Sequence, residues 1–259
     1  MVREITILGS SGTKGSHGGT SAFYINAENV IDAGNLLQPL GVESAQIETV
    51  WLTHSHLDHI MDIAYILDSY FNERKKSLVL RGLPETLEAV RVHLLNDLLW
   101  PDFSKIGLTD GAGPSLRYEP LVLGERYRLD EETYIEAYET DHTVASCGYI
   151  VTKAEESLLI TADTYSLLST TDMVKRRDDI KTIVVECSFP TKMFALAKVS
   201  KHLTPRLLFE GLAPLEAKGI KLYINHIKPR YMKKICSEIA QEKGSWRVEI
   251  LKDGEKIHF

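Results

Sequence analysis

The chain has 259 residues, 44% of them hydrophobic and 25% charged, and its formal net charge at pH 7 is −6. This composition is typical of a globular protein, and the negative charge argues against a general affinity for nucleic acid. Three widely spaced cysteines without a CxxC pair argue against a disulfide framework and favour a reducing compartment. No segment has the length and apolarity of a membrane span or a signal peptide, so we expect a cytoplasmic protein.

Short β-type segments dominate the first part of the chain. Strands are predicted at 4–9, 21–26, 29–34, 49–54 and 77–82. After the fourth strand, amphipathic spacing predicts a helix whose apolar face holds Ile60, Ile63, Ala64, Leu67 and Phe71. A second helix is expected from Pro84 to about Leu99, followed by a loop that contains GAGP at 111–114.

The second part of the chain repeats this order of strands and helices. Strands are predicted at 132–140, 146–152, 157–163 and 182–188, and helices after Thr204 and at 230–244. Thr204 is a suitable N-cap, Pro205 suits the first helical position, and Gly244 suits a helix end. The pattern predicts an α/β protein with one domain, 1–259, in which two mixed sheets pack face to face with helices outside, a four-layer αββα sandwich.

A glycine-rich segment, ILGSSGTKGSHGGTS at 7–21, follows the first strand, and Asp32 lies twenty residues after Gly12. A dinucleotide site would require a helix directly after these glycines, because the helix N-terminus holds the pyrophosphate. Here TSAFYINAENVIDAG follows, which alternates as a β-hairpin does. We therefore expect a glycine loop between two strands, with His17 as a solvated loop residue.

The segment LTHSHLDHIMDI at 52–63 concentrates His54, His56, Asp58 and His59, although the chain has only nine histidines. The segment is predicted to form the end of a strand, a loop and the start of a helix. In the extended part His54 and His56 lie on the same face, and Asp58 and His59 follow at the turn into the helix. Imidazole and carboxylate are ligands for zinc, and also suit iron or manganese. The alternative is that Asp58 caps the helix and the histidines are surface residues, but the combined pattern favours metal.

Further candidate ligands follow other strands of the predicted fold. They are His142, Asp163 and His226, each at or just after an apolar strand-like segment. A buried carboxylate at such a position is costly without a partner. With the first cluster, these residues form a coherent set of seven candidate ligands.

The motifs THSHLDH and ADT, with His142 and His226, are similar to those of the metallo-β-lactamase superfamily, whose αββα sandwich agrees with the predicted architecture. Within it, the chain resembles the class II cyclic-nucleotide phosphodiesterases. The segments that carry this resemblance are HLDHIMDI, LLNDLLWPDFS, DHTVASCGY, ECSFP, SKHLTP and NHIKP. One departure is Asp62, where such enzymes commonly have a small residue.

The resemblance implies two divalent metal ions, zinc most of all, with manganese or iron as alternatives. One ion would be held by His54, His56 and His142, the other by Asp58, His59 and His226, with Asp163 bridging them. It implies hydrolysis of 3′,5′-cyclic AMP or GMP to the 5′-nucleotide, because a hydroxide between two ions can attack phosphorus. It further implies a small-molecule substrate, no membrane association, and a possible homodimer.

SKHLTP supplies the candidates for phosphate binding and proton transfer. Lys201 and His202 lie just before a helix N-terminus, where backbone N–H groups and the helix dipole favour an anion. We expect His202 to contact the phosphate or act as the general acid, with Lys201 as a second substrate-binding candidate. Asp58 is the other expected catalytic residue.

Other activities share this set of ligands. Related hydrolases that process tRNA 3′ ends, or that open lactones, thioesters or β-lactams, are the nearest alternatives. The acidic chain lacks the long Gly/Lys-rich insertion of the tRNA nucleases, which makes nucleic acid an unlikely partner. A redox diiron protein typically has a carboxylate in place of His56, and a non-catalytic metal-binding sensor would not require all seven ligands.

Overall fold

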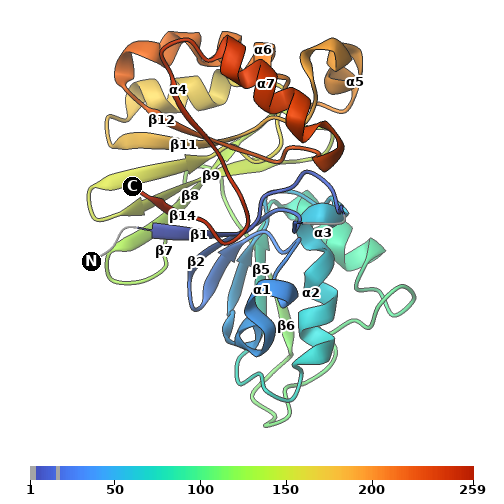
Figure 1. Ribbon diagram of the computed structural model, residues 1–259. Helices are drawn as coiled ribbons and strands as arrows, with labels where there is room; N and C mark the ends of the chain where they lie inside the picture. The colour runs from blue at the N-terminus through green and yellow to red at the C-terminus, as the bar shows by residue number, and fades with distance from the viewer. Residues whose placement is uncertain (1–3, 16–17) are drawn as a thin grey trace.

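Two seven-stranded sheets lie face to face in the computed structural model, which describes residues 4–15 and 18–259 (Figure 1). The first sheet has the strand order β14-β1-β2-β3-β4-β5-β6. Pairing is antiparallel from β14 to β3 and parallel from β3 to β6. The bounds are β1 Glu4–Gly9, β2 Ala22–Asn26, β3 Asn29–Ile31, β4 Thr49–Trp51, β5 Leu78–Gly82, β6 Leu116–Pro120 and β14 Lys256–His258.

The second sheet has the order β13-β12-β11-β10-β9-β8-β7. It is antiparallel from β7 to β10 and parallel from β10 to β13, so both sheets are mixed. Its strands are β7 Arg126–Arg128, β8 Thr133–Glu139, β9 Cys147–Lys153, β10 Glu156–Ile160, β11 Ile180–Glu186, β12 Lys221–Asn225 and β13 Arg247–Ile250.

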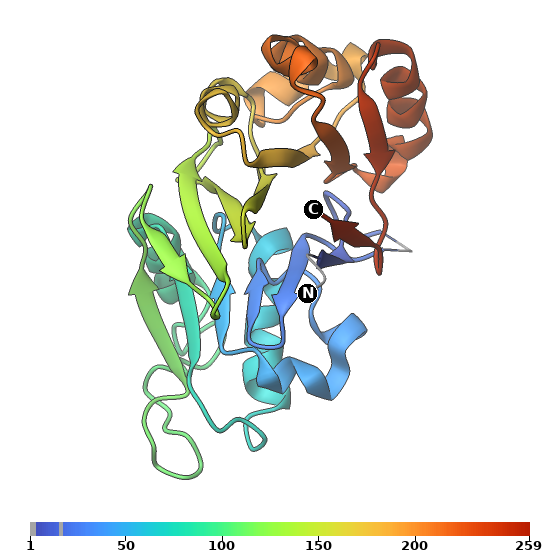
Figure 2. The same ribbon diagram turned by 90° about the vertical axis from the view of Figure 1, so that its left-hand side faces the viewer.

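Helices cover the outer face of each sheet. The N-terminal helices and the orange to red C-terminal helices lie on opposite sides of the molecule (Figure 2). On the first side are α1 Leu37–Leu40, the 3-10 helix η1 Gly41–Gln46, α2 Leu57–Ser69 and α3 Pro84–His93. On the second are α4 Leu168–Arg176, α5 Phe194–Val199, α6 Pro205–Leu212 and α7 Met232–Glu242, with short 3-10 turns η2 Thr191–Met193, η3 Ala213–Lys218 and η4 Pro229–Tyr231.

Three apolar clusters separate these four layers. Between the sheets, Trp51 of β4 is in the same cluster as Tyr149 of β9. Its neighbour Val50 points the other way and joins the cluster under α2 and α3, because successive side chains of a strand face opposite sides. A third cluster lies between the second sheet and α4, α6 and α7. The predicted αββα sandwich of the α/β class is therefore confirmed.

The individual predictions hold for the long elements and fail at some ends. Thr204 caps α6, with its hydroxyl accepting from the Leu207 N–H at 3.4 Å. The helix expected to reach Leu99 ends instead at His93. The side-chain carbonyl of Asn96 accepts the N–H groups of Leu98 and Leu99, which closes a tight loop in place of another helical turn. Within the described residues, none of the helices is long and apolar enough to cross a membrane.

The glycine-rich segment leads into a hairpin, as predicted, rather than a helix. β2 pairs antiparallel with β3, and the side-chain carbonyl of Asn26 accepts the N–H groups of Glu28 and Asn29 at the turn. The geometry needed to place a pyrophosphate on a helix is therefore absent from the described part of this segment. His17 lies outside the described residues.

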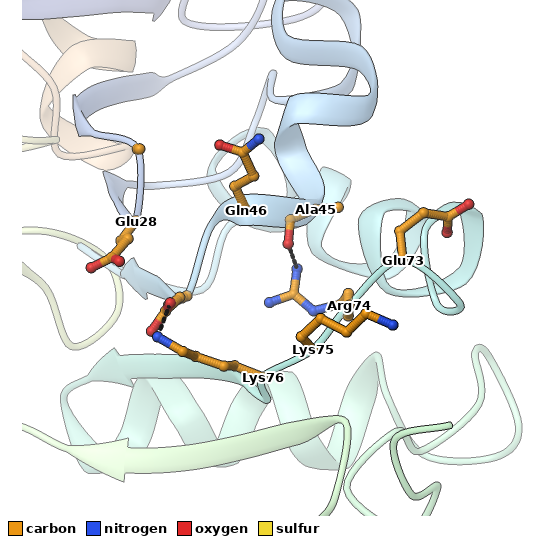
Figure 3. Close-up of a pocket in the computed structure, with 9 residues that line it drawn as sticks. Glu28, Ala45, Gln46, Glu73, Arg74, Lys75 and Lys76 are labelled. Atoms are coloured by element: carbon orange, nitrogen blue, oxygen red, sulfur yellow. Dashed lines mark hydrogen bonds and ion pairs between the residues drawn. The ribbon is translucent and has the colours of Figure 1, made fainter. Parts of the chain in front are cut away.

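At the end of the molecule where β4 and β5 begin, Arg74 closes the C-terminal end of η1. Its side chain is only 1% exposed, and it donates to the carbonyls of Ala45 and Ile47 at 3.3 and 2.6 Å. Figure 3 shows the guanidinium beneath Ala45 while Lys75 points away from it. Since the last carbonyls of a helix lack intrahelical donors, this buried cation satisfies them.

Candidate metal centre

The loop between β4 and α2 brings two of the predicted histidines together. The strand ends at Trp51 and the helix begins at Leu57, so His54 and His56 lie on five irregular residues. His54 is fully buried, and its Nε2 lies 3.1 Å from Nδ1 of His56. The same His56 atom lies 3.2 Å from Nε2 of His142, which follows β8. Three ring nitrogens from two sheets thus converge on one point.

A second group forms on the adjoining side. Asp58 and His59 belong to the first turn of α2, and His226 follows β12. Nε2 of His226 lies 3.2 Å from Nε2 of His59 and 3.3 Å from Oδ2 of Asp58. Because the Asp58 carboxylate faces His226 and makes no capping hydrogen bond, the alternative of a simple helix cap is not supported.

Asp163, three residues after β10, lies between the two groups. Its Oδ2 is 3.7 Å from Nε2 of His54, and its Oδ1 is 3.3 Å from Nε2 of His226. The described residues form three sets whose potential ligand atoms lie within 4.8 Å of one another: His54, His56, His142 and Asp163; Asp58, His59 and His226; and Asp163, His202 and His226. Asp163 belongs to the first and the third set. The structure thus brings all seven predicted ligand residues together.

The chemistry of this group fits divalent metal ions. Asp163 is 2% exposed, and its buried Oδ1 accepts no hydrogen bond. A buried carboxylate oxygen without a donor is unfavourable unless a cation takes its place. Clustered imidazole and carboxylate ligands at a buried position are the donors that zinc and similar metals use.

The protonation states of the clustered histidines and of Asp163 also fit metal binding. Burial lowers the pKa of His54 well below its usual range, lowers that of His56, and brings that of His142 to about 4. These rings are therefore neutral at pH 7 and offer lone pairs. Burial would raise the pKa of Asp163, but the neighbouring rings of His226 and His59 outweigh it, so the carboxylate is ionised.

Hydrogen bonds on the far side of the rings determine which nitrogen faces the group. Nδ1 of His142 donates to the Lys201 carbonyl at 3.0 Å, and Nδ1 of His226 lies 3.0 Å from the Ser188 hydroxyl. A proton on Nδ1 leaves Nε2 with its lone pair directed to the centre. These outer partners therefore orient the potential ligands before any ion arrives.

Asp32 is an outer partner that the sequence reasoning missed. It is fully buried after β3, and its carboxylate accepts the Thr53 N–H at 2.8 Å and Nδ1 of His59 at 2.6 Å. Burial would lower the pKa of His59, but the charges of Asp32 and Asp163 raise it well above its usual value. The signal was available, since NVIDAG places an aspartate after an apolar strand, as LLITAD does for Asp163.

His202 lies within the same region, joined to a second unpredicted carboxylate. Its Nδ1 lies 2.8 Å from Oε1 of Glu186, the last residue of β11, and its ring stacks on His226. Burial would lower the pKa of His202, but Glu186 outweighs this effect and raises it. Ser188 links the pair to the centre, because its hydroxyl donates to Glu186 at 2.9 Å and also contacts His226.

Lys201 is placed differently from His202. Its ammonium lies 2.5 Å from Oδ1 of Asp141, and its backbone has a positive φ of 50°. Its carbonyl, rather than its charge, contacts the centre through His142. The structure therefore brings Lys201 beside the site with its ammonium engaged in an ion pair.

The glycine-rich segment packs against the backbone that carries His226. A Cβ added at Gly12 would lie 2.3 Å from the His226 carbonyl oxygen, so only glycine fits. The Lys228 ammonium donates to the Gly12 carbonyl at 2.8 Å. Asp253 accepts the N–H groups of Ser10 and Gly19 and so joins the two ends of the segment.

Comparisons with known proteins agree with this arrangement. Residues 28–118 match the model of the class II cAMP phosphodiesterase family. The chain is 24% identical over 253 residues to 3′,5′-cyclic-nucleotide phosphodiesterase 1 of Saccharomyces cerevisiae, covering 82% of this chain and 67% of that protein. The predicted resemblance to the class II phosphodiesterases is thereby confirmed.

Solved structures show the same fold. Unliganded yeast PDE1 superposes with a TM-score of 0.82 at 20% identity over the full length of both chains. The metallo-β-lactamase fold protein YhfI from Bacillus subtilis gives 0.72 at 17% identity, again over the full length of both. The short form of human tRNase Z gives 0.67 at 17% identity over 98% of each chain. The fold is therefore that of the metallo-β-lactamases.

Proposed function

Since the chain is a metal-dependent hydrolase with the metallo-β-lactamase fold, we propose that it hydrolyses 3′,5′-cyclic nucleotides, cAMP or cGMP, to 5′-nucleotides. The observation that carries this proposal is the match of residues 28–118 to the class II phosphodiesterase model. That segment includes His54, His56, Asp58 and His59, so the resemblance covers part of the candidate centre itself. The yeast relative, named for the same reaction, supports it.

We assign the seven residues to two ions. His54, His56 and His142 would hold one, Asp58, His59 and His226 would hold the other, and Asp163 would be shared by both. The two groups of ligand atoms, with Asp163 within 3.8 Å of rings in both, support a shared carboxylate. Zinc suits this donor set best, with manganese or iron as alternatives. Two bound divalent ions supply an activated water and neutralise the phosphoryl oxygens.

The side chains provide the proton transfers of the reaction. The Asp58 carboxylate, 27% exposed, accepts a proton from the attacking water. As the new P–O bond forms, the bond from phosphorus to the ribose 3′-oxygen breaks, and that oxygen takes a proton from His202. Glu186 holds Nδ1 of His202, which leaves Nε2 as the donor. Lys201 contributes to phosphate binding if its ammonium leaves Asp141.

Product analysis tests the proposal. Protein loaded with zinc, manganese or iron is incubated with cAMP and with cGMP, and the products are separated by chromatography. We expect the 5′-nucleotide, no 3′-nucleotide, two metal ions per chain, and complete loss of turnover with a chelator. Cleavage of a tRNA precursor, a lactone or a thioester without turnover of either cyclic nucleotide would refute the assignment.

Two variants examine the assigned roles separately. Asp163→Ala should abolish turnover and reduce metal content, whereas His202→Ala should reduce turnover with both metal ions retained. Full activity in Asp163→Ala would refute the assignment of Asp163 as the shared carboxylate. Loss of metal in the second would make His202 a ligand rather than a proton donor.

A further inference from the structure

A cavity of about 710 Å³ adjoins the candidate metal centre and shares His142 with it. Three connections form its walls: the start of α3, the segment 121–123 after β6, and the loop 139–146 between β8 and β9. Lys201 also lines it. Cavities of a few hundred to a thousand Å³ are typical of small-molecule sites. A ligand held at the centre therefore has room to extend past His142.

The walls of the cavity carry exposed apolar side chains. Val122 is 61% exposed, Leu123 41% and Val144 38%. They come from two different connections and line the same cavity. Isolated exposed apolar residues are common, but their gathering around one hollow next to a catalytic centre marks a ligand-binding surface. The group that fits these walls is uncharged and largely apolar.

The charged groups of the cavity define the occupant further. They are the carboxylates of Glu85, Glu139 and Asp141 and the ammonium of Lys201, which is already paired with Asp141. The excess of carboxylates offers hydrogen-bond acceptors for N–H donors and repels additional phosphates. This charge disfavours an RNA chain, which would bring further phosphates along these walls.

We propose that the cavity beside His142 is the nucleobase subsite, in which Val122, Val144 and Leu123 contact the base of a cyclic mononucleotide. This inference rests on the proposed function, because the base can reach the cavity only when its cyclic phosphate occupies the metal centre. A nucleobase is flat and uncharged, has apolar faces, and carries N–H groups at its edge. It therefore matches both the apolar side chains and the carboxylates that line the cavity.

The test compares a cyclic nucleotide with a substrate that lacks the base. Val144→Trp places a large side chain in the cavity, and Val122→Asp adds a charge at a position exposed enough to tolerate it. We expect each to lower kcat/KM for cAMP and cGMP at least tenfold, mainly through KM. The 3′,5′-cyclic phosphate of 1-deoxyribose should be affected less than threefold. Leu98→Trp, at a 93% exposed position outside the cavity, is the matched control and should change neither.

The outcomes separate this inference from the function on which it rests. If the unmodified protein hydrolyses neither cyclic nucleotide, the proposed function fails. If it hydrolyses them, and both variants affect the two kinds of substrate equally or not at all, the subsite is refuted while the function stands. Metal content and thermal unfolding of each variant show that the centre and the fold are intact.

Discussion

Replacing Asp32 by Asn should weaken metal binding although Asp32 touches no metal in the proposed centre. Asn keeps one oxygen, which is required by the Thr53 N–H at 2.8 Å. Its NH₂ group then faces Nδ1 of His59, which is 2.6 Å from the carboxylate in the native protein. Metal binding requires a neutral His59 ring with its proton on Nδ1 and its lone pair on Nε2. Because two donors cannot share the contact with the new amide in Asp32→Asn, the neutral ring then carries its proton on Nε2. That nitrogen faces His226 and Asp163, so the change removes a lone pair from the centre.

The size of the effect follows from this single tautomer change. Loss of an outer partner of a metal-binding histidine typically reduces metal affinity 10–100-fold, which corresponds to about 1.4–2.8 kcal/mol. We expect the upper part of that range, since Asp32 is fully buried and water cannot replace its carboxylate. Turnover at saturating metal should fall less than affinity does, because excess metal restores the occupied centre.

Competition with a chromophoric zinc chelator at pH 7.5 measures the affinity directly. Asp62→Asn is the matched control: Asp62 is also a buried carboxylate near the centre, but it accepts the N–H groups of Leu36 and Leu37 at 2.6 and 2.9 Å. It should lower stability and leave zinc affinity unchanged. Zinc affinity within twofold of the native value in Asp32→Asn would refute the tautomer argument.

Three further changes give distinct readouts. Gly12→Ala, whose Cβ would lie 2.3 Å from the His226 carbonyl oxygen, should reduce metal content and turnover while the sheets stay folded, as measured by metal analysis and circular dichroism. Arg74→Ala should lower the free energy of unfolding by about 3 kcal/mol in urea titration, since two carbonyls lose a buried charged donor. The hydrogen bond from Arg177 lowers the pKa of Asp179 to about 2, so its stabilisation is present above pH 4 and is lost as pH falls from 4 to 2. Asp179→Asn should therefore cost about 1 kcal/mol at pH 7, allowing for solvent screening, and flatten stability over that range of pH.

Each of these changes has a control in the same kind of position. Gly107→Ala should be harmless, because its Cβ would meet only a carbonyl oxygen at 3.7 Å. Lys75→Ala removes an exposed neighbour of Arg74, and Asp172→Asn removes an exposed carboxylate on α4. Equal losses in a variant and its control would mean that the named contact does not cause the effect.

The part of the candidate centre that is close in sequence was predictable, and so were the candidate ligands that follow apolar strands. His54, His56, Asp58 and His59 stand out because their spacing alone brings them together at a strand–helix junction. His142, Asp163 and His226 were candidates because each lies at or just after an apolar strand-like segment, where a buried carboxylate is costly without a partner. The four layers were predictable because the apolar periods of the strands and helices require two sheets, each covered by helices.

The outer partners were not predicted, because their role depends on which ring nitrogen they meet. Asp32 and Glu186 are single carboxylates in apolar surroundings, and nothing in their spacing assigns one to His59 and the other to His202. Short edge strands such as β7 and β14 were also missed. Three residues are too few for a period, and pairing with a long neighbour stabilises such strands more than their own side chains do.

The position of β14 has a consequence for the order in which the protein assembles during synthesis. β1 pairs with β14, so one edge of Glu4–Gly9 stays open until Lys256–His258 has been made. At ordinary translation rates that interval is roughly 12–50 s, during which an exposed strand edge is a site for wrong pairing with other chains. Asp253, which joins the ends of the glycine-rich segment, also appears only then. The ribosome therefore makes His54, His56 and His59 early, and it makes both His226 and the residue that secures the loop beside it late. The site thus reaches its final form only once almost all of the chain is present.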